Sequence, residues 1–110
     1  MVSSKLVAAS SAPIVLAILT GGESYGYAIL QRIAAVSDGA LDWTEGMLYP
    51  VLHRMEREGL IKAFWRPSES GRRRKYYSIA AKGKRALAEQ REEWRVVQDT
   101  LGELLGGSSV

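Results

Sequence analysis

The chain has 110 residues, 46% hydrophobic and 25% charged, which suits one globular domain and is short for an enzyme. It contains no cysteine, and this excludes disulfides, thiolate metal sites and thiol catalysis. The net charge of +3 is unevenly spread, with a local balance of +8 over residues 54–85 and −5 over the rest of the chain. Such a distribution is typical of a surface that binds a polyanion, and it favours nucleic acid over a plain solvated face.

The N-terminal segment carries one basic residue, Lys5, ahead of the apolar run 12–19. This run is too short to span a bilayer, and it lacks the cleavage site of a signal peptide. We therefore expect a cytoplasmic protein with a buried helix over 13–20, in which Pro13 takes an early position and two glycines end the helix. A longer helix that starts near Ser4 and bends at the proline is the alternative.

The apolar spacing predicts a second helix over 25–36 and, after a short extended segment over 41–43, a third helix over 45–59. Thr44 is expected to cap the third helix, and a glycine is expected to close it. A helical wheel turns four apolar side chains of this third helix inward: Leu48, Val51, Leu52 and Met55. The opposite, outward face is predicted to hold Gly46, Tyr49, Pro50, His53, Arg54 and Arg57.

Two segments rich in β-branched and aromatic residues, 61–66 and 75–79, are separated by seven to eight residues that include Ser, Pro and Gly. This pattern predicts a β-hairpin with a long loop. Four consecutive cations are expected at its tip: Arg72, Arg73, Arg74 and Lys75. A mainly α fold with a small basic hairpin beside an exposed helix is the plan of a winged helix-turn-helix, in which that helix enters the major groove of DNA.

A final helix is predicted over 80–105. Its apolar residues follow a heptad spacing, and the side chains expected at a dimer interface are Leu87, Trp94, Val97, Leu101 and Leu104 (or Leu105). Such a terminal helix has no partner left within its own small chain, so the spacing predicts a homodimer. We expect a winged helix-turn-helix unit over 1–80, with a dimerisation helix and tail over 81–110 in the same compact body.

The outward side chains of the third helix suit base reading. Arg54 can donate two hydrogen bonds to guanine, which is worth on the order of 1–3 kcal/mol of base discrimination. Tyr49 is expected against sugar, phosphate or a thymine methyl, and His53 suits a base contact as well as it suits an idle surface position. The four wing cations are expected to contact phosphates and to make binding salt-dependent. Further phosphate contacts are expected at the helix starts, from Ser24, Tyr25 and Thr44.

Trp94 lies on the dimer seam, where two indoles facing each other would form flat walls for a planar aromatic ligand. Filling of the interface is the alternative, and the residues alone favour it. The sequence predicts no enzyme, cofactor or metal site, because it has one histidine, scattered acids and no Gly-rich phosphate loop. An RNA-binding sheet is disfavoured because Tyr76 and Tyr77 should point to opposite faces of the hairpin.

Nearly the whole chain, 14–105, resembles the PadR family of bacterial transcriptional regulators, especially the small members with a single C-terminal helix. The motifs that carry the resemblance are, in order, YGY (25–27), LYPVLHRMEREGLI (48–61), Trp65, GRRRKYYSI (71–79), KG (82–83) and Trp94. The resemblance implies a winged helix-turn-helix repressor that binds a double-stranded, inverted-repeat operator as a homodimer. It also implies that a phenolic, cationic or multidrug-type aromatic ligand releases the DNA in some members.

Carried over to this sequence, the resemblance makes Tyr49, His53 and Arg54 recognition-helix positions and makes Arg73, Arg74 and Lys75 wing positions. Trp94 matches the tryptophan that lines a flat central pore in multidrug-binding members. The turn before the recognition helix departs from the family's Ser-Pro-Gly pattern, because Glu45 places a negative charge there. The alternative function is a winged-helix module that binds another protein without specific DNA binding.

Overall fold

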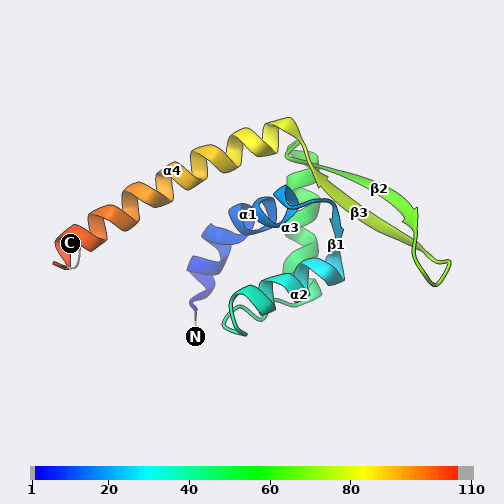
Figure 1. Ribbon diagram of the computed structural model, residues 1–110, viewed down its shortest axis with the longest axis horizontal. Helices are drawn as coiled ribbons and strands as arrows, with labels where there is room; N and C mark the ends of the chain where they lie inside the picture. Colours follow the sequence, from blue (N-terminus) through cyan, green and yellow to red (C-terminus); the bar gives the residue numbers. More distant parts are fainter. Residues whose placement is uncertain (1, 107–110) are drawn as a thin grey trace.

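The computed structural model describes residues 2–106. The elements follow one another as α1 (Ser4–Thr20), β1 (Ser24–Tyr25), α2 (Gly26–Val36), α3 (Glu45–Arg57), β2 (Ile61–Pro67), β3 (Arg73–Ile79) and α4 (Ala81–Leu104). Figure 1 shows the β2–β3 hairpin and α4 leaving a three-helix unit on opposite sides. This arrangement confirms the predicted fold class, mainly α with a small hairpin and a long C-terminal helix.

The first helix is the longer of the two alternatives that the sequence allowed. Ser3 caps α1, and its hydroxyl oxygen accepts a hydrogen bond from the backbone N–H of Leu6 at 3.2 Å. The helix continues through Pro13 to Thr20, so the prediction of a start at the proline is wrong. Its second half supplies the apolar side chains that reach the core, and three of these are buried: Val15, Leu16 and Leu19.

A two-stranded sheet was predicted, but the structure has three strands in the order β1-β3-β2. Ser24 and Tyr25 form β1 and pair antiparallel with Tyr77 and Tyr76 of β3, respectively. The second helix therefore begins at Gly26, one residue later than predicted. A strand of two residues is too short to leave any periodicity in a sequence, so only the paired partner reveals it.

The recognition-helix candidate α3 begins as predicted, with the Thr44 hydroxyl oxygen accepting from the backbone N–H of Met47 at 3.3 Å. Three of the four residues that were predicted to face inward, Leu48, Leu52 and Met55, have no exposed surface. Val51 is only half-buried. The helix ends at Arg57 rather than at 59, because the chain turns away through the left-handed backbone of Gly59 (φ 78°).

The hairpin has longer strands and a shorter loop than the sequence indicated. β2 and β3 pair from Ile61 with Ile79 out to Pro67 with Arg73, which leaves only residues 68–72 for the turn. Gly71 takes the positive φ of 86° that closes this turn. Three of the four consecutive cations consequently lie on strand β3 rather than at the loop tip, which corrects the prediction.

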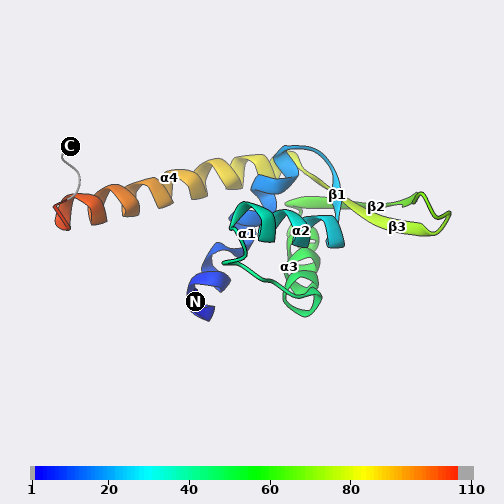
Figure 2. The ribbon, with the colours of Figure 1, turned by 60° about the horizontal axis from the view of Figure 1, so that its bottom comes forward.

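The first half of the last helix, α4, packs against the core, and α4 contacts α1. Leu87 is buried in this contact, but the residues further along the predicted seam are not. Figure 2 shows the second half of α4 extending beyond every other element. Within residues 2–106, none of the helices combines the length and the apolar character that a membrane span requires.

Candidate nucleic-acid interface

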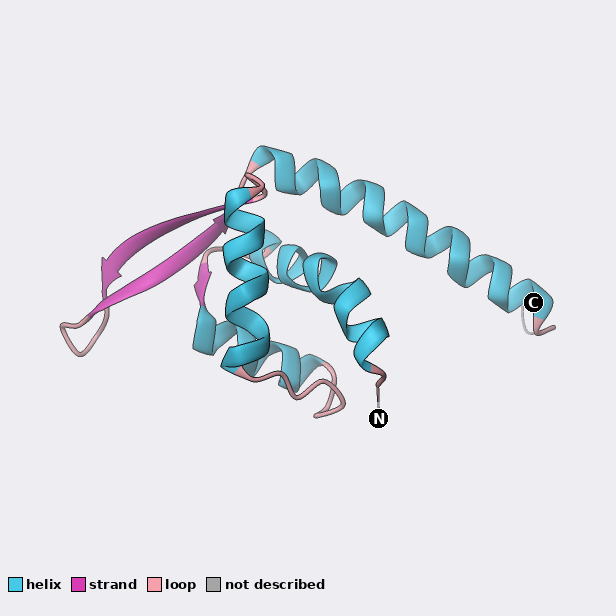
Figure 3. Ribbon diagram, turned by 180° about the vertical axis from the view of Figure 1, so that it is seen from behind, coloured by secondary structure: helices cyan, strands magenta, loops and turns pink. Residues whose placement is uncertain are grey.

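A cleft of about 470 Å³ lies where α2 begins, α3 passes and the hairpin rises; we call it the wing cleft. Figure 3 shows α3 running between the hairpin on one side and α1 on the other. The residues that line the wing cleft are mostly aromatic or basic: Tyr25, Gly26, Tyr27, Tyr49, His53, Trp65, Arg74, Lys75 and Tyr77. Aromatic and cationic side chains together provide stacking surfaces and charge for a polyanion.

Tyr49 and His53 face the wing cleft from α3, with their ring centroids 6.3 Å apart. Tyr49 is half-buried because it packs against the first turn of α2. A Cβ on Gly26 would stand 2.4 Å from the Tyr49 hydroxyl oxygen, so a larger residue there would displace the ring from this position. The Tyr49 ring thus lies against the first turn of α2, whereas His53 is exposed and available.

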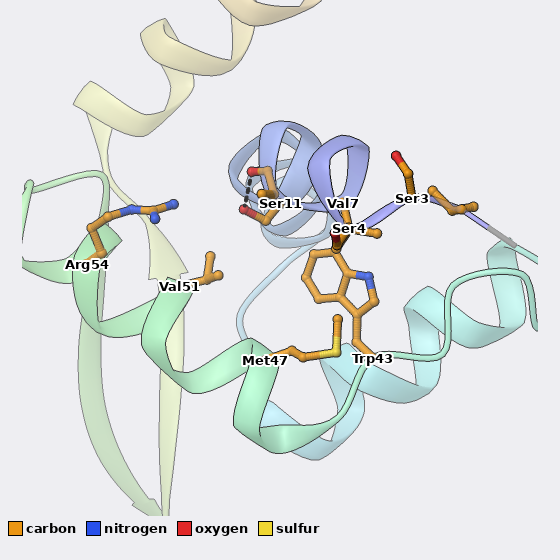
Figure 4. Close-up of a pocket in the computed structure, with 10 residues that line it drawn as sticks. Ser3, Ser4, Val7, Ser11, Trp43, Met47, Val51 and Arg54 are labelled. Atoms are coloured by element: carbon orange, nitrogen blue, oxygen red, sulfur yellow. Dashed lines mark hydrogen bonds between the residues drawn. The ribbon is translucent and has the colours of Figure 1, made fainter.

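Arg54 points to a different side of α3 from His53. It lines a separate groove against α1 together with Met47 and Val51, which precede it at helical spacing (Figure 4). The structure therefore does not bring Arg54 together with the other two recognition-helix candidates. The exposed strip of α3 that includes His53 instead continues to Arg57, a residue that the predicted site omitted although helical spacing indicates it.

The four consecutive cations of the hairpin separate into two pairs. The guanidinium carbon of Arg74 lies 3.9 Å from the centre of the Tyr25 ring, a close cation–π contact. Lys75 approaches the Glu56 carboxylate of α3 at 3.5 Å. Arg72 and Arg73 are exposed and form no ion pair within the described part of the chain. Arg74 and Lys75 thus connect the hairpin to β1 and α3, whereas Arg72 and Arg73 are free to bind phosphate.

The outer face of the sheet carries an aromatic cluster that the sequence did not predict. Tyr76 meets Tyr25 edge-on at 5.3 Å and stacks with Phe64 at 6.0 Å between ring centroids. The Arg66 guanidinium lies 5.0 Å from both the Phe64 and the Tyr76 rings, and Arg74 covers Tyr25. These contacts join all three strands, so we infer that the cluster stiffens the hairpin. The rings are capped by arginine rather than open for stacking with bases.

Two large exposed aromatic residues at the rim of the wing cleft were missed as site residues. Trp65 is 56% exposed and stands opposite Lys75 in the strand register. Tyr27 is 58% exposed at the start of α2. The cross-strand pairing of Trp65 with Lys75 places both side chains on the same face of the sheet, and this register could not be read from the sequence.

The helix starts that were expected to contact phosphate differ in what they offer. Thr44 is exposed, and its hydroxyl oxygen serves as the cap of α3, which leaves the hydroxyl hydrogen to donate outward. Tyr25 precedes α2 without capping it by its side chain, so the first N–H groups of that helix keep their capacity to donate.

Tyr77 forms the floor of the wing cleft and has no exposed surface. Burial raises the pKa of its hydroxyl to about 12, and the nearby Tyr49 and Glu56 add to the shift. The preceding residue, Tyr76, lies in the outer aromatic cluster, which confirms that the two tyrosines point to opposite faces of the hairpin. In residues 2–106 no group of three or more potential ligand side chains is placed to hold a metal ion.

The predicted dimer residues lie along α4 with rising exposure toward its end. Leu87 is 8% exposed and already belongs to the core of its own chain. Trp94 is 36% exposed and borders an apolar groove of about 650 Å³ between α1 and α4. Beyond it, Val97, Leu101 and Leu104 are about half-exposed or more.

Three helices, a basic wing and a cleft between the wing and the third helix define a winged helix-turn-helix protein. The chain belongs to the family described as the transcriptional regulator PadR-like family, whose sequence model matches residues 15–89. This match confirms the resemblance carried by the sequence motifs. It makes the protein a transcriptional regulator of a family that consists of regulators rather than enzymes.

Solved structures of similar proteins share the whole architecture. A PadR-like transcriptional regulator from Bacillus cereus is 32% identical, with a TM-score of 0.82 over 96% of this chain and 100% of that chain. A transcriptional regulator from Clostridium thermocellum is 30% identical, with a TM-score of 0.83 over 91% of this chain and 97% of that one.

Two curated relatives match the chain in sequence. An uncharacterized protein from Lysinibacillus sphaericus is 31% identical over 107 residues, which is 97% of this chain and 98% of that protein. A transcriptional regulator from Mycobacterium tuberculosis is 41% identical over 64 residues, 58% of this chain and 56% of that protein.

Proposed function

We propose that the protein is a repressor that binds an inverted-repeat operator as a homodimer. Helix α3 enters the major groove, and the β2–β3 hairpin lies along the phosphate backbone. The observation that carries this proposal is the wing cleft, which sets His53 on α3 beside a hairpin whose Arg72 and Arg73 form no ion pair among the described residues. The two half-sites are expected about one helical turn apart.

Base reading is assigned to the exposed strip of α3, with His53 at its centre. A histidine N–H can donate to guanine or adenine N7, and Arg57 on the same strip can donate to guanine. Arg54 is proposed to reach the DNA from the α1 side of the helix, at an edge of the half-site. Tyr49 is proposed to support the helix on the sugar–phosphate backbone, because its ring is held against Gly26.

Phosphate binding is assigned to the free wing cations and to the helix starts. Arg72 and Arg73 provide charge at the outer end of the hairpin. Arg74 and Lys75 line the wing cleft, where their contacts to Tyr25 and Glu56 fix the position of the hairpin relative to α3. Thr44 is proposed to donate to the same strand through its hydroxyl. These contacts set position and register rather than sequence preference.

The homodimer is proposed to form through the second half of α4. Its exposed apolar residues and the apolar groove beside α1 are complementary in character, so a second chain's helix would cover both. In such a pair, the two Trp94 indoles face each other and provide flat walls for a planar aromatic ligand. The ligand would change the angle between the two reading heads.

The operator is tested by gel-shift titration against the DNA upstream of the protein's own and neighbouring genes, at low and moderate salt. We expect a discrete shift that resists non-specific competitor DNA and is weakened by His53→Ala. Weak binding to every fragment that salt abolishes would instead favour a protein-binding winged-helix module. That alternative also predicts that alanine at Arg72, Arg73 and Arg74 abolishes partner capture and leaves DNA affinity unchanged.

The ligand is tested by the emission of Trp94 in a chain with Trp43→Phe and Trp65→Phe, titrated with aromatic cations and with phenolic acids. Quenching accompanied by release of operator DNA supports the ligand role. Unchanged emission and unchanged DNA affinity with both classes would leave Trp94 as a packing residue of the interface.

A further inference from the structure

One face of the β2–β3 hairpin begins in the core and continues outward as an open surface. Every second residue of a strand points to the same face. Along β2 this face carries Ile61, Ala63 and Trp65, and the exposed fraction rises from 2% at Ile61 to 56% at Trp65. Trp65 borders the wing cleft together with His53, so the open part of this face is turned toward α3. Figure 3 shows the hairpin leaving the body beside that helix.

Trp65 differs from the other aromatic side chains of the hairpin in that its ring has no stacking partner. Phe64 and Tyr76 stack with each other on the opposite face, where the Arg66 guanidinium covers both rings. Tyr77 is fully buried. Within residues 2–106, no aromatic ring and no cation stacks on the Trp65 indole. An exposed indole keeps a large apolar area in water, and this area is available to a binding partner.

Two cations lie beside Trp65 on the same face. Lys75 stands directly opposite it in the strand register, and Arg73 lies two residues further out on β3, opposite Pro67. Direct cross-strand neighbours are about 5 Å apart between Cβ atoms, and diagonal neighbours are roughly 7 Å apart. Arg73 is exposed and forms no ion pair in the described part of the chain. A phosphate bound by Arg73 would therefore bring the neighbouring group of a nucleic-acid backbone against the indole.

That neighbouring group is a sugar, because deoxyribose alternates with phosphate along a DNA strand. We propose that the Trp65 indole packs against a deoxyribose of the operator, where the strand passes between α3 and the hairpin. This contact rests on the proposed function, because it requires DNA bound along α3, and it adds an apolar contact to the ionic ones. The sugar is the same at every base pair, so Trp65 contributes affinity and register rather than base preference.

The apolar character of the contact separates it from the phosphate contacts of the wing. A cation that binds a phosphate displaces condensed counterions, so its removal lowers the dependence of affinity on salt. An indole that packs on a sugar displaces none. Trp65→Ala is therefore expected to weaken operator binding about tenfold or more without changing the slope of log affinity against log salt. Arg73→Ala is expected to reduce that slope.

The position of the contact is tested by hydroxyl-radical footprinting of the full chain on an operator fragment. The radical attacks the carbons of deoxyribose, so the cleavage pattern reports which sugars the protein covers. Trp65→Ala is expected to expose sugars in each half-site that the parent chain protects. Trp65→Phe keeps a flat apolar ring and is expected to retain most of the protection and of the affinity.

Val36→Ala is the matched control, because Val36 is 70% exposed at the end of α2 and does not border the wing cleft. It is expected to change neither the footprint nor the affinity, and circular dichroism checks that each variant folds. The proposal fails if Trp65→Ala leaves the sugar protection unchanged, or if it lowers the salt slope as Arg73→Ala does. A parent chain that protects no DNA fragment would instead overturn the proposed function, and the Trp65 contact with it.

Discussion

Gly83, in the first turn of α4, is the residue on which the packing of that helix depends most directly. A Cβ at this position would stand 2.1 Å from the carbonyl oxygen of Leu60 and 3.0 Å from the Ile79 side chain. The first of these atoms belongs to the backbone, so it cannot rotate away. Glycine therefore lets α4 start against the base of the hairpin, and this contact sets the direction in which the helix leaves the body.

Gly83→Ala is expected to lower the free energy of unfolding by about 3 kcal/mol, because the added methyl group forces α4 off the backbone of Leu60. Gly102→Ala is the matched control on the same helix, where an added Cβ meets nothing within 4 Å. It is expected to raise stability by up to about 1 kcal/mol through helix propensity. Urea unfolding of both variants measures the difference, and equal stabilities would contradict the packing role of Gly83.

The buried hydroxyl of Tyr77 should make the stability of the protein depend on pH in the alkaline range. Its folded pKa of about 12 lies above the ordinary value of 10.0, so the unfolded chain ionises first as the pH rises. The contribution of Tyr77 to stability is fully present below pH 10 and is lost between pH 10 and about 12. The unfolding free energy of the parent chain, relative to that of Tyr77→Phe, should therefore decrease as the pH rises across this range. A difference that stays constant with pH would show that burial does not hold the hydroxyl neutral.

Elements that repeat an apolar pattern over several turns could be predicted from the sequence. The start of α3 and the length of α4 follow from a cap and from periodicity, and both were right within a residue or two. The full length of α1 was ambiguous because Pro13 is tolerated in a longer helix. Strand β1 was missed because its existence depends on pairing with β3, which no local pattern encodes.

The wing shows that local sequence patterns are also insufficient to predict which residues of a site are available for binding. Its four cations are plain in the sequence, but which of them are free is decided by residues from other elements. Arg74 forms a cation–π contact with Tyr25 of β1, and Lys75 forms an ion pair with Glu56 of α3. Arg54 and His53 are likewise neighbours in sequence, yet they serve different grooves because successive helix positions are about 100° apart.

Because Arg72 and Arg73 are free whereas Arg74 and Lys75 are engaged, variants of the two pairs should differ in how steeply their DNA affinity depends on salt. Replacing both Arg72 and Arg73 by alanine should reduce the slope of log affinity against log salt by roughly 2, since two phosphate contacts are lost. Lys75→Ala should change that slope less, because Lys75 already pairs with Glu56. Arg95→Ala is the control, as Arg95 lies on α4 between Glu92 and Asp99. Fluorescence anisotropy over a salt series measures each slope, and equal slopes for all variants would refute the division.

At the scale of the molecule, the shape itself is unusual for a lone chain. The extents of 55 × 29 × 23 Å reflect a long helix, α4, whose end extends beyond the other elements (Figure 2). Trp94, Val97 and Leu101 lie exposed along one side of it, and the α1–α4 groove lies next to Trp94. Exposed apolar area of this kind is typical of an association surface. A second copy of the chain is the proposed partner.

Leu101→Glu is expected to convert the proposed dimer to a monomer near 12.1 kDa, because it places a charge in the apolar seam. Val96→Glu is the matched control, since Val96 is also about half-exposed but lies off the heptad spacing. It should remain dimeric. Sedimentation equilibrium distinguishes the two, and a dimer that survives Leu101→Glu but not Val96→Glu would place the interface on the other side of α4.

The central claim is that two copies of α3 read two half-sites on the same side of the DNA. The most direct measurement is the affinity of the dimer for its operator before and after five base pairs are inserted between the half-sites. Since this insertion turns one half-site by roughly half a helical turn, we predict a loss of about a hundredfold or more. An affinity unchanged by the insertion would contradict the account, because the two reading heads would then not act as one rigid dimer.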